Sequence, residues 1–212
     1  MSAEPRAAWL PAGDLCLFAG VAALLLAGVF HWTAPRIAEQ QRRLEQQALQ
    51  EIAPPQLTRI QAQPLSLPGG ALGHSAPVSA WQLLDEHGTV AAVILPVRAP
   101  DGYNGAIDML MGLDRQQRIS GVRVTEHRET PGLADGIERR RSDWIEQYDG
   151  RSLGDPDFEQ WTVQREGGEF DQLTGATVTP RAISRALGRA LQWAQSEQAM
   201  LFDPQSGREE TP

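Results

Sequence analysis

Lysine is absent from this sequence of 212 residues, and cysteine occurs only once. The single cysteine, Cys16, excludes an intrachain disulfide and a redox pair of thiols, and it is most simply a small apolar residue. All 19 basic residues are arginine, against 27 acidic residues, which gives a net charge of −8. After residue 33 there are 18 arginines and 25 acidic residues. This acidic balance argues against nucleic acid or anionic lipid as a partner.

Two kinds of site lack support in the sequence. Ser142 and the four histidines form no recognisable pair of nucleophile and base, so hydrolytic catalysis is unsupported. Glu126, His127 and Glu129 contain potential metal ligands. However, alternate residues of a strand face opposite sides, and no second histidine lies nearby. We therefore expect no metal site.

Long apolar runs are scarce, and the most prominent one lies near the N-terminus. The 18 residues from Leu15 to Trp32 contain no Asp, Glu, Arg or Lys. This length is just sufficient to span the hydrocarbon core of a bilayer, and Trp32 suits an interfacial anchor. A cleaved signal peptide is the rival interpretation. Because Arg6 is the only basic side chain before the run and no clean Ala-x-Ala site follows it, we expect an uncleaved transmembrane helix at residues 14–33.

Two segments are expected between this helix and a folded domain. A helix is predicted over residues 35–53, between Pro35 and the pair Pro54-Pro55. Its narrow apolar stripe, which could pair with a partner helix or dock on the chain's own domain, consists of Ile37, Leu44, Ala48 and Ile52. Residues 54–77 contain five prolines and the pair Gly69-Gly70, which predicts an irregular connection.

The pattern of the remaining chain predicts an α+β domain. Strands are expected at residues 90–97, 107–113 and 119–124, with a turn at residues 114–117 between the last two. A helix is expected at residues 137–148, and a further strand at residues 161–163. Strand pairs followed by helices are typical of the α+β class. No internal repeat is evident.

The segment DQLTGATVTP at residues 171–180 precedes a strongly helical stretch. Thr179 is a good N-cap, and Pro180 suits the first helical position. Free N–H groups at a helix start attract anions, and the Gly-Ala turn has no bulky side chains, so a phosphate would be stabilised beside the Thr177 hydroxyl. An ordinary capped turn is the alternative. The helix is predicted from an apolar face formed by Ile183, Ala186, Leu187, Ala190, Leu191 and Ala194.

Three ordered blocks give the chain a resemblance to a known family. The sequence DQLTGAT at residues 171–177 resembles the flavinylation motif of periplasmic FMN-binding domains. APDGYNGAI at residues 99–107 and GVRVTEHRETPGL at residues 121–133, followed by SDWI at 142–145, resemble the same family. Over about residues 14–198 the chain is similar to the G subunits of the Rnf/Rsx ion-translocating electron transport complexes. The related C subunit of the sodium-pumping NADH:quinone reductase fits these blocks less closely.

The resemblance implies a cofactor and the residues that hold it. FMN would be joined by a phosphoester to Thr177, within the turn that also contains Thr174, Gly175 and Ala176. The loop comprising Glu129, Thr130, Pro131, Gly132 and Leu133 would lie against the isoalloxazine ring; taken structurally, its Thr-Pro-Gly sequence fits a type II turn. Tyr103 and Gly105 would lie near the cofactor, although their segment is first of all a tight turn.

Charged residues around the motif have two interpretations each. Asp171 would either cap the local turn or be recognised by the transferase that attaches the flavin; it is expected to point away from the ester, because a carboxylate repels a phosphate. Arg181 and Arg185 could pair with the phosphate, or they are ordinary exposed arginines on a helix face.

The resemblance also implies a domain organisation. It comprises a cytoplasmic tail (1–13), a transmembrane helix (14–33), a juxtamembrane helix (34–55), a periplasmic FMN-binding domain (56–198) and a flexible tail (199–212). The arginines oppose this orientation, because Arg6 stands alone before the span while Arg36, Arg42 and Arg43 follow it. We follow the family and expect a single-pass protein of the bacterial inner membrane with its domain in the periplasm.

The implied function is electron transfer within an ion-translocating ferredoxin/NAD oxidoreductase complex. Expected partners are the other membrane and iron–sulfur subunits of the Rnf/Rsx complex, a flavin transferase during maturation, and the lipid bilayer. The protein would contribute position and tuning, since the redox chemistry belongs to the flavin. Two alternatives are a component like the C subunit of the sodium-pumping reductase, and a cofactor-free, membrane-anchored assembly or binding module.

Overall fold

The structure is a computed structural model that describes residues 16–25, 27–28, 30–32, 51–54 and 61–206. The chain divides into two compact units, Met1–Gln47 and Ala48–Pro212. In the first unit, every described residue from 16 to 32 is helical. Among the described residues, no helix combines the length and the apolar character needed to cross a membrane. The predicted juxtamembrane helix lies outside the described residues, apart from residues 51–54, of which Glu51 and Ile52 are helical.

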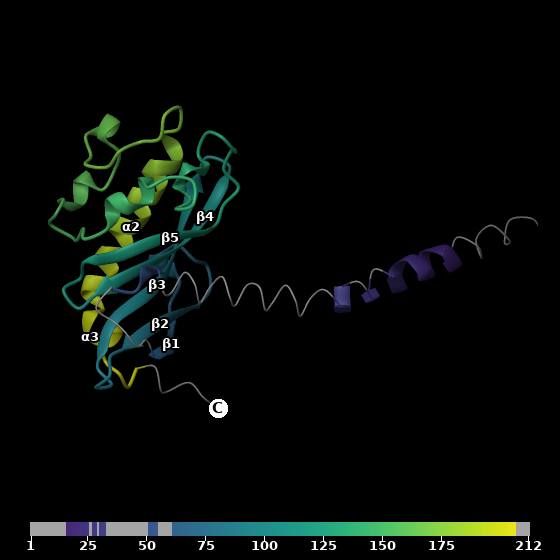
Figure 1. Ribbon diagram of the computed structural model, residues 1–212, viewed down its shortest axis with the longest axis horizontal. Helices are drawn as coiled ribbons and strands as arrows, with labels where there is room; N and C mark the ends of the chain where they lie inside the picture. The colour runs from purple at the N-terminus through teal and green to yellow at the C-terminus, as the bar shows by residue number, and fades with distance from the viewer. Residues whose placement is uncertain (1–15, 26, 29, 33–50, 55–60, 207–212) are drawn as a thin grey trace, which may run out of the picture. The chain divides into compact units, whose positions relative to one another are not determined.

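The second unit is built on a five-stranded antiparallel sheet in which each strand pairs with its neighbours in the sequence (Figure 1). The strands are β1 (Gln61–Leu67), β2 (Val78–Leu84), β3 (Val90–Gly102), β4 (Gly105–Asp114) and β5 (Ile119–Glu126). The apolar run at residues 90–97 lies within β3, and the alternating residues 107–113 lie within β4. The predicted turn at residues 114–117 is closed by the Gln117 N–H, which donates to the Asp114 carbonyl at 3.0 Å.

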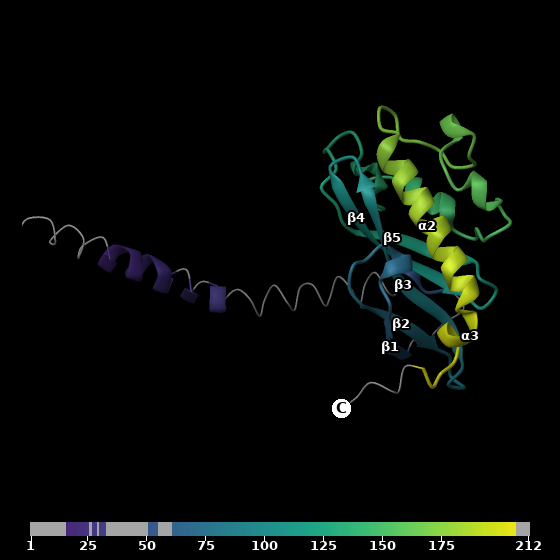
Figure 2. The same cartoon turned by 180° about the vertical axis from the view of Figure 1, so that it is seen from behind.

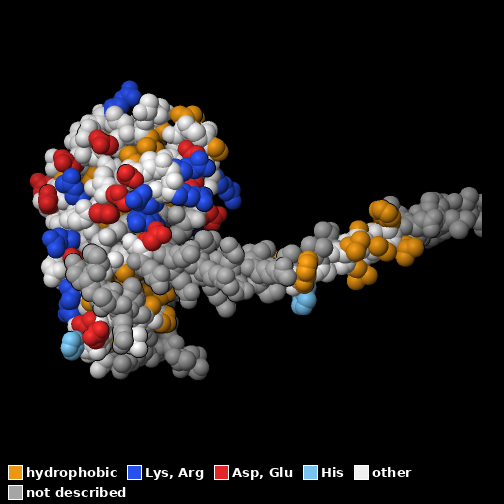
Figure 3. Space-filling model, viewed as in Figure 1, with side chains coloured by type: hydrophobic (Ala, Val, Ile, Leu, Met, Phe, Trp, Pro, Cys, Tyr) orange, Lys and Arg blue, Asp and Glu red, His pale blue; other side chains and the backbone are white. Residues whose placement is uncertain are grey.

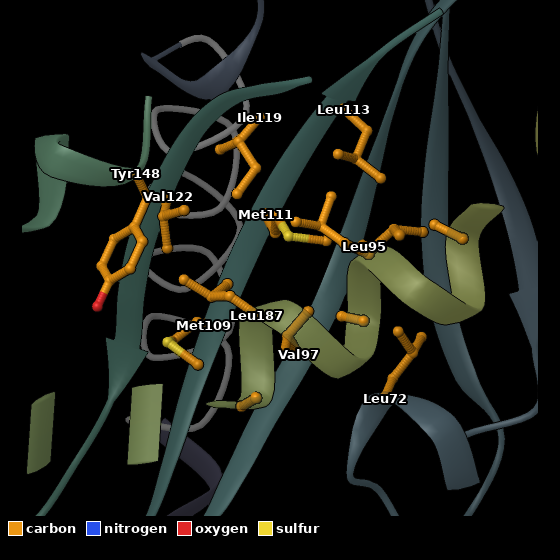
Figure 4. Packing of buried hydrophobic residues seen from close by; sticks show 14 of the residues in the cluster. Leu72, Leu95, Val97, Met109, Met111, Leu113, Ile119, Val122, Tyr148 and Leu187 are labelled. Atoms are coloured by element: carbon orange, nitrogen blue, oxygen red, sulfur yellow. The ribbon is translucent and has the colours of Figure 1, made fainter. Parts of the chain in front are cut away.

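One face of the sheet is covered by α2 (Val178–Ser196), as Figure 2 shows. The predicted apolar face of this helix is confirmed, because all six of its residues are buried. In Figure 4, Leu187 of α2 lies between Val97 of β3 and Met109 of β4. Tyr148, Trp161 and Phe170 extend the same core as a group of aromatic rings. The expected α+β class is therefore confirmed for this domain.

The prediction of an irregular connection over residues 54–77 is wrong at residues 61–67, which form β1. The strand was missed because Pro64 interrupts it, yet proline is tolerated in an edge strand that pairs on one side only. Leu65 and Leu67 of β1 are buried and alternate with polar residues. The next strand, β2, was also missed; residues on both of its faces are buried, so it has no polar alternation to reveal it.

Two further predictions are corrected between β5 and α2. The helix expected at residues 137–148 is instead a pair of short 3-10 helices, η2 (Asp135–Ile137) and η3 (Trp144–Tyr148). Between them the Ser142 hydroxyl donates to the Gly136 carbonyl at 2.6 Å and accepts from the Trp144 N–H at 3.2 Å, contacts that compete with helical hydrogen bonds. The strand expected at residues 161–163 is reduced to one bridge between Val163 and Phe170.

The packed domain continues past residue 198, where the sequence prediction ended it. The short helix α3 (Gln198–Leu201) places Leu201 fully in the core. The buried side-chain amide of Gln82 donates to the carbonyls of Leu201 and Asp203, both at 2.9 Å. These contacts tie residues 198–203 to β2, while residues 207–212 of the predicted tail lie outside the described part of the chain.

Candidate functional site

The first turn of α2 differs from the prediction in its starting residue. Thr177 is the N-cap, and its carbonyl accepts from the Arg181 N–H at 3.1 Å, so the helix begins at Val178. Thr179 was expected to be the cap and Pro180 the first helical residue; both lie inside the first turn. Proline is accommodated there because N–H groups of the first turn have no acceptor within the helix. Within the described chain, the Thr177 hydroxyl makes no capping hydrogen bond, so it is free for another partner.

The chain enters α2 through a tight turn at residues 173–176. The Ala176 N–H donates to the Leu173 carbonyl at 3.0 Å, and Gly175 has a φ of +80°. That left-handed conformation favours glycine. Thr174 is exposed and Thr177 is half-buried. The turn thus presents a hydroxyl next to the helix start, where unpaired N–H groups and the helix dipole favour an anion.

A second turn, at residues 130–133, lies against the first. Its closing hydrogen bond runs from the Leu133 N–H to the Thr130 carbonyl at 3.2 Å, and Gly132 has a φ of +78°. Pro131 at the second position and Gly132 at the third agree with the predicted type II turn. Leu133 Cδ2 lies 3.0 Å from the position that a Cβ atom on Gly175 would take. The two turns are therefore in contact, and the missing side chain of Gly175 makes room for Leu133.

The block APDGYNGAI at residues 99–107 contains the tip of the hairpin between β3 and β4, where Gly102 pairs with Gly105. Gly105 has a φ of +126°, and Tyr103 is 69% exposed. The backbone N–H of Asn104 donates to Glu129 Oε1 at 3.0 Å. The Asn104 side chain donates to Thr130 Oγ1, also at 3.0 Å. These two bonds attach the hairpin tip to the loop that follows β5.

Glu129 connects all three segments. Its side chain is buried, with 4% of the residue exposed. While Oε1 accepts from Asn104, Oε2 accepts from the hydroxyl of Thr179 in the first turn of α2. A Cβ atom on Gly102 would approach Oε1 to 3.0 Å and the Gly105 carbonyl oxygen to 2.3 Å, so the approach requires glycine there. Glu129 was expected to bind the cofactor. In the structure, both oxygens of its carboxylate accept hydrogen bonds from other residues of the protein.

His127 supports the same loop from the other side. Its Nδ1 accepts from the Glu129 N–H at 3.1 Å, and its Nε2 contacts Glu138 Oε1 at 3.0 Å. Burial opposes ionisation of Glu138, but contacts with Arg140 and His127 outweigh it and lower the pKa of the Glu138 carboxyl. Asn104, Thr179 and His127 also belong to this site, and none of them was predicted from the sequence. The hydrogen bonds from Asn104 and Thr179 to Glu129 join residues 25 and 50 positions apart, so the local sequence pattern does not indicate them.

The charged residues beside the motif are engaged in ordinary contacts. Glu166 accepts from Arg181 at 2.7 Å and from Arg185 at 3.2 Å, and the Arg181 contact is the main cause of its lowered pKa. Asp171 is exposed and is held through its backbone: its carbonyl accepts from Trp144 Nε1 at 2.8 Å, and its N–H donates to Gln147 Oε1 at 2.7 Å. Figure 3 shows arginine and acidic side chains interspersed over the visible face of this domain.

The arrangement suits a phosphate ester of a flat aromatic group. An unused hydroxyl lies at a helix start, and the apolar side chains of Leu133 and Tyr103 are exposed beside the same cluster of loops. Gly132 has a positive φ, and the space at its Cβ position is open, which permits close approach of a ligand to the backbone there. The residues present therefore fit FMN.

Comparison with known proteins agrees with this fit. The model of the FMN-binding domain family matches residues 102–192, and the model of the RnfG N-terminal region matches residues 1–52. The G subunit of the ion-translocating oxidoreductase complex of Pseudomonas aeruginosa (strain UCBPP-PA14) is 45% identical over 194 residues, 90% of each chain. The protein of the same name from Shewanella baltica (strain OS223) is 38% identical, covering 89% of this chain and 90% of that one.

Among solved structures, the crystal structure of Shewanella oneidensis NqrC matches this chain with a TM-score of 0.49 and 21% identity. The match covers 65% of this chain and 69% of that one.

Proposed function

The chain belongs to the family of G subunits of ion-translocating oxidoreductase complexes, and we propose that it carries FMN as a phosphoester on Thr177 and passes electrons between partner subunits. The single observation that carries the attachment site is the half-buried Thr177 hydroxyl at the N-cap of α2, free of any capping bond within the described chain. Bound FMN supplies the electron-transfer chemistry, since flavins exchange electrons singly or in pairs.

The chain's own residues hold and orient the group. Thr177 anchors the phosphate, and the turn formed by Thr174, Gly175 and Ala176 leaves space around it. The first-turn N–H groups of α2 stabilise the negative charge of the ester. Thr177 is therefore an anchoring residue and takes no part as acid, base or nucleophile during turnover.

The loop of Thr130, Pro131, Gly132 and Leu133 presents backbone and one exposed apolar side chain to the ring. Tyr103 and Gly105 border the same space from the hairpin tip. Glu129 contributes indirectly, because its carboxylate joins Asn104 to Thr179 and so fixes the hairpin relative to the helix start. A covalent bond suits a carrier in an aqueous compartment, where a dissociable cofactor would be lost by dilution.

The organisation proposed for the whole chain is a cytoplasmic tail (1–13), a membrane-spanning helix (14–33), a juxtamembrane helix (34–55) and a periplasmic FMN-binding domain. The apolar run from Leu15 to Trp32 supports the span. Membrane and iron–sulfur subunits of the complex would be its redox partners, and a flavin transferase would attach the FMN. Alkaline phosphatase fused after residue 60 should be active; an inactive fusion, with a cytoplasmic reporter active instead, would reverse the orientation.

The attachment is tested on protein purified from the native host. Intact mass should show one covalent FMN, the colour should survive denaturation, and peptide mapping should locate the added mass on the fragment containing Thr177. Thr177→Ala should be colourless while retaining its fold. Thr174→Ala is the matched control, because Thr174 lies in the same turn and is exposed. Covalent flavin retained in Thr177→Ala would move the site, first to Thr174 or Thr179.

A further inference from the structure

The imidazole of His127 contacts the chain on both sides of the turn at residues 130–133. Before the turn, Nδ1 accepts from the Glu129 N–H at 3.1 Å. After the turn, Nε2 lies 3.0 Å from Glu138 Oε1. One side chain therefore joins the two ends of the loop that contains this turn. Because it follows directly on β5, His127 also fixes the position of the loop relative to the sheet.

The side chain of His127 is directed into the domain, although its neighbours in the sequence are not. It is 14% exposed, whereas Thr125, Glu126 and Arg128 are exposed residues. The side chain of Glu138 is covered to a similar degree, with 15% exposed. A hydrogen bond between covered groups is stronger than the same bond in water, because the local dielectric is lower. The contact between His127 and Glu138 is therefore part of the interior of the domain.

The two contacts assign the tautomer of His127. A backbone N–H can only donate, so Nδ1 has to present its lone pair to Glu129. In a neutral imidazole the hydrogen then lies on Nε2, which donates to the carboxylate of Glu138. Both contacts are made together only by the neutral form with its hydrogen on Nε2.

Protonation of the imidazole removes one of these contacts. The added hydrogen occupies Nδ1, which then faces the Glu129 N–H as a second donor. The contact with Glu138 is kept. Burial raises the pKa of that carboxyl, but the contacts with Arg140 and His127 outweigh burial and lower the pKa below its ordinary value, so the group stays ionised. The loop is thus released at Glu129 and held at Glu138.

The charged groups in contact with this pair do not replace the lost bond. Glu138 contacts Arg140, and the oxygen that faces His127 lies 3.6 Å from Arg141 Nε. Both arginines are donors, so neither can accept from a backbone N–H. The carboxylate of Glu129 accepts hydrogen bonds on both of its oxygens from other segments. Protonation of His127 therefore leaves the Glu129 N–H without its acceptor.

We propose that His127 is a positioning residue for the flavin: its unprotonated Nδ1 holds the turn at residues 130–133 at the ring, and protonation releases that turn. This inference rests on the proposed function. Histidine side chains change charge at about pH 5–8, so the surroundings of the flavin should change across that range. His127 acts through the loop and exchanges no proton with the flavin.

Two substitutions separate the roles of the two ring nitrogens, both in the full-length protein with covalent FMN. His127→Asn puts a side-chain oxygen near the place of Nδ1, where it can accept from the Glu129 N–H as in an Asx turn. Because asparagine does not titrate, the absorption spectrum of the oxidised flavin should stay at the high-pH form of the wild type throughout the range. His127→Gln can reach Glu138 but lacks the acceptor for Glu129, so its spectrum should stay at the low-pH form.

Two further measurements examine the loop itself. Amide exchange at Glu129 should be about tenfold faster in His127→Gln than in His127→Asn at the same pH, because the N–H has lost its acceptor. The nitrogen chemical shifts of labelled histidine should identify wild-type His127 as the tautomer with its hydrogen on Nε2 at the upper end of the range.

His87→Asn is the matched control. His87 is an exposed histidine in the turn between β2 and β3. This variant should keep the pH dependence of the wild-type flavin spectrum. If His127→Gln fails to fold, the pH series of the wild type and of His127→Asn decides the proposal alone.

Three results would overturn the proposal: a wild-type flavin spectrum that is constant over the range, a transition that persists in His127→Asn, or a tautomer with its hydrogen on Nδ1. A histidine with a purely structural role would lower the melting temperature on substitution and give the first of these results. Failure of the proposed function looks different, because the wild-type protein would then contain no covalent flavin. Amide exchange at Glu129 and the tautomer of His127 would still show whether the imidazole holds the loop.

Discussion

The first turn of α2 and the remaining turns of the same helix depend on different interactions. From Ile183 to Ala194 the helix is held by apolar packing against the sheet (Figure 4). In the first turn, Thr177 leaves its hydroxyl unused for capping and Thr179 donates to the buried carboxylate of Glu129. One end of the helix thus belongs to the candidate site and its loops, and the rest belongs to the apolar core that stabilises the domain.

The stability of the domain and the geometry of its site therefore depend on different residues. Apolar packing is non-directional, so the body of the helix tolerates small shifts as long as volume is conserved. Hydrogen bonds depend on geometry, and those of Glu129 fix the relative positions of three loops. Substitutions in the helix body should therefore change the free energy of unfolding, whereas substitutions among the loops should change the flavin.

Leu187→Ala should have the largest effect on stability. Leu187 is fully buried in the core, so its truncation should lower the free energy of unfolding by about 2–5 kcal/mol. Urea titration followed by tryptophan fluorescence measures this loss. At temperatures where the variant is folded, we expect stoichiometric covalent FMN with an unchanged absorption spectrum. A shifted spectrum in folded Leu187→Ala would show that the helix body also tunes the cofactor. Stability and cofactor tuning would then not depend on separate parts of the helix.

Glu129→Ala should have an intermediate effect on stability and a clear effect on the flavin. The substitution leaves the Asn104 N–H and the buried Thr179 hydroxyl without their acceptor, at a cost of about 1–3 kcal/mol for each buried group. Because the hairpin and the helix start are then uncoupled, the flavin spectrum or reduction potential should shift. Equilibrium unfolding and redox titration measure the two effects.

The conservative variant Glu129→Gln separates the geometry from the charge. A glutamine can still accept from Asn104, so the flavin spectrum should be closer to the wild type than in Glu129→Ala. Glu126→Ala is the control, because Glu126 is an exposed glutamate at the end of β5, directly before the loop that contains Glu129. If both Glu129 variants kept the wild-type spectrum and potential, Glu129 would be a structural residue without influence on the site.

The sequence predicted those parts of the fold that are governed by local pattern. The run at residues 90–97 and the alternation at residues 107–113 identified β3 and β4, because a buried strand needs continuous or alternating apolar residues. The apolar face of α2 was equally readable. β1 and β2 were not predicted. Pro64 interrupts β1, and residues on both faces of β2 are buried, so neither segment shows the alternation of apolar and polar residues that indicates a strand.

The site was predictable in its motifs and not in its internal contacts. The turns at residues 130–133 and 173–176 follow from their glycines, which take the left-handed conformations that a tight turn needs. The bond from Thr179 to Glu129 joins residues 50 positions apart and therefore requires the folded chain. That bond also explains the error at the helix start, because the hydroxyl expected to cap α2 is used elsewhere and Thr177 takes the cap position.

Gly132→Val should have the smallest effect on global stability. This variant tests directly whether the loop at residues 130–133 influences the flavin. Gly132 has a φ of +78°, and a Cβ atom there would meet no other atom within 4 Å. The branched side chain thus has space, and its cost is backbone strain of about 1–3 kcal/mol. Because covalent attachment at Thr177 does not depend on this turn, FMN content should remain stoichiometric while the absorption spectrum or reduction potential shifts.

Gly150→Val is a closely matched control for that shift. Gly150 also has a φ of +78° and also has open space around its Cβ position, but it lies between η3 and the bridge at Ser152, away from the three loops. Both variants should lose similar stability in urea titrations, since both carry the same conformational cost. Only Gly132→Val should alter the flavin. Should the two variants leave the spectrum and potential equally untouched, the turn at residues 130–133 does not face the ring, and the apolar surface beside Thr177 would have to come from Tyr103 and the hairpin tip instead.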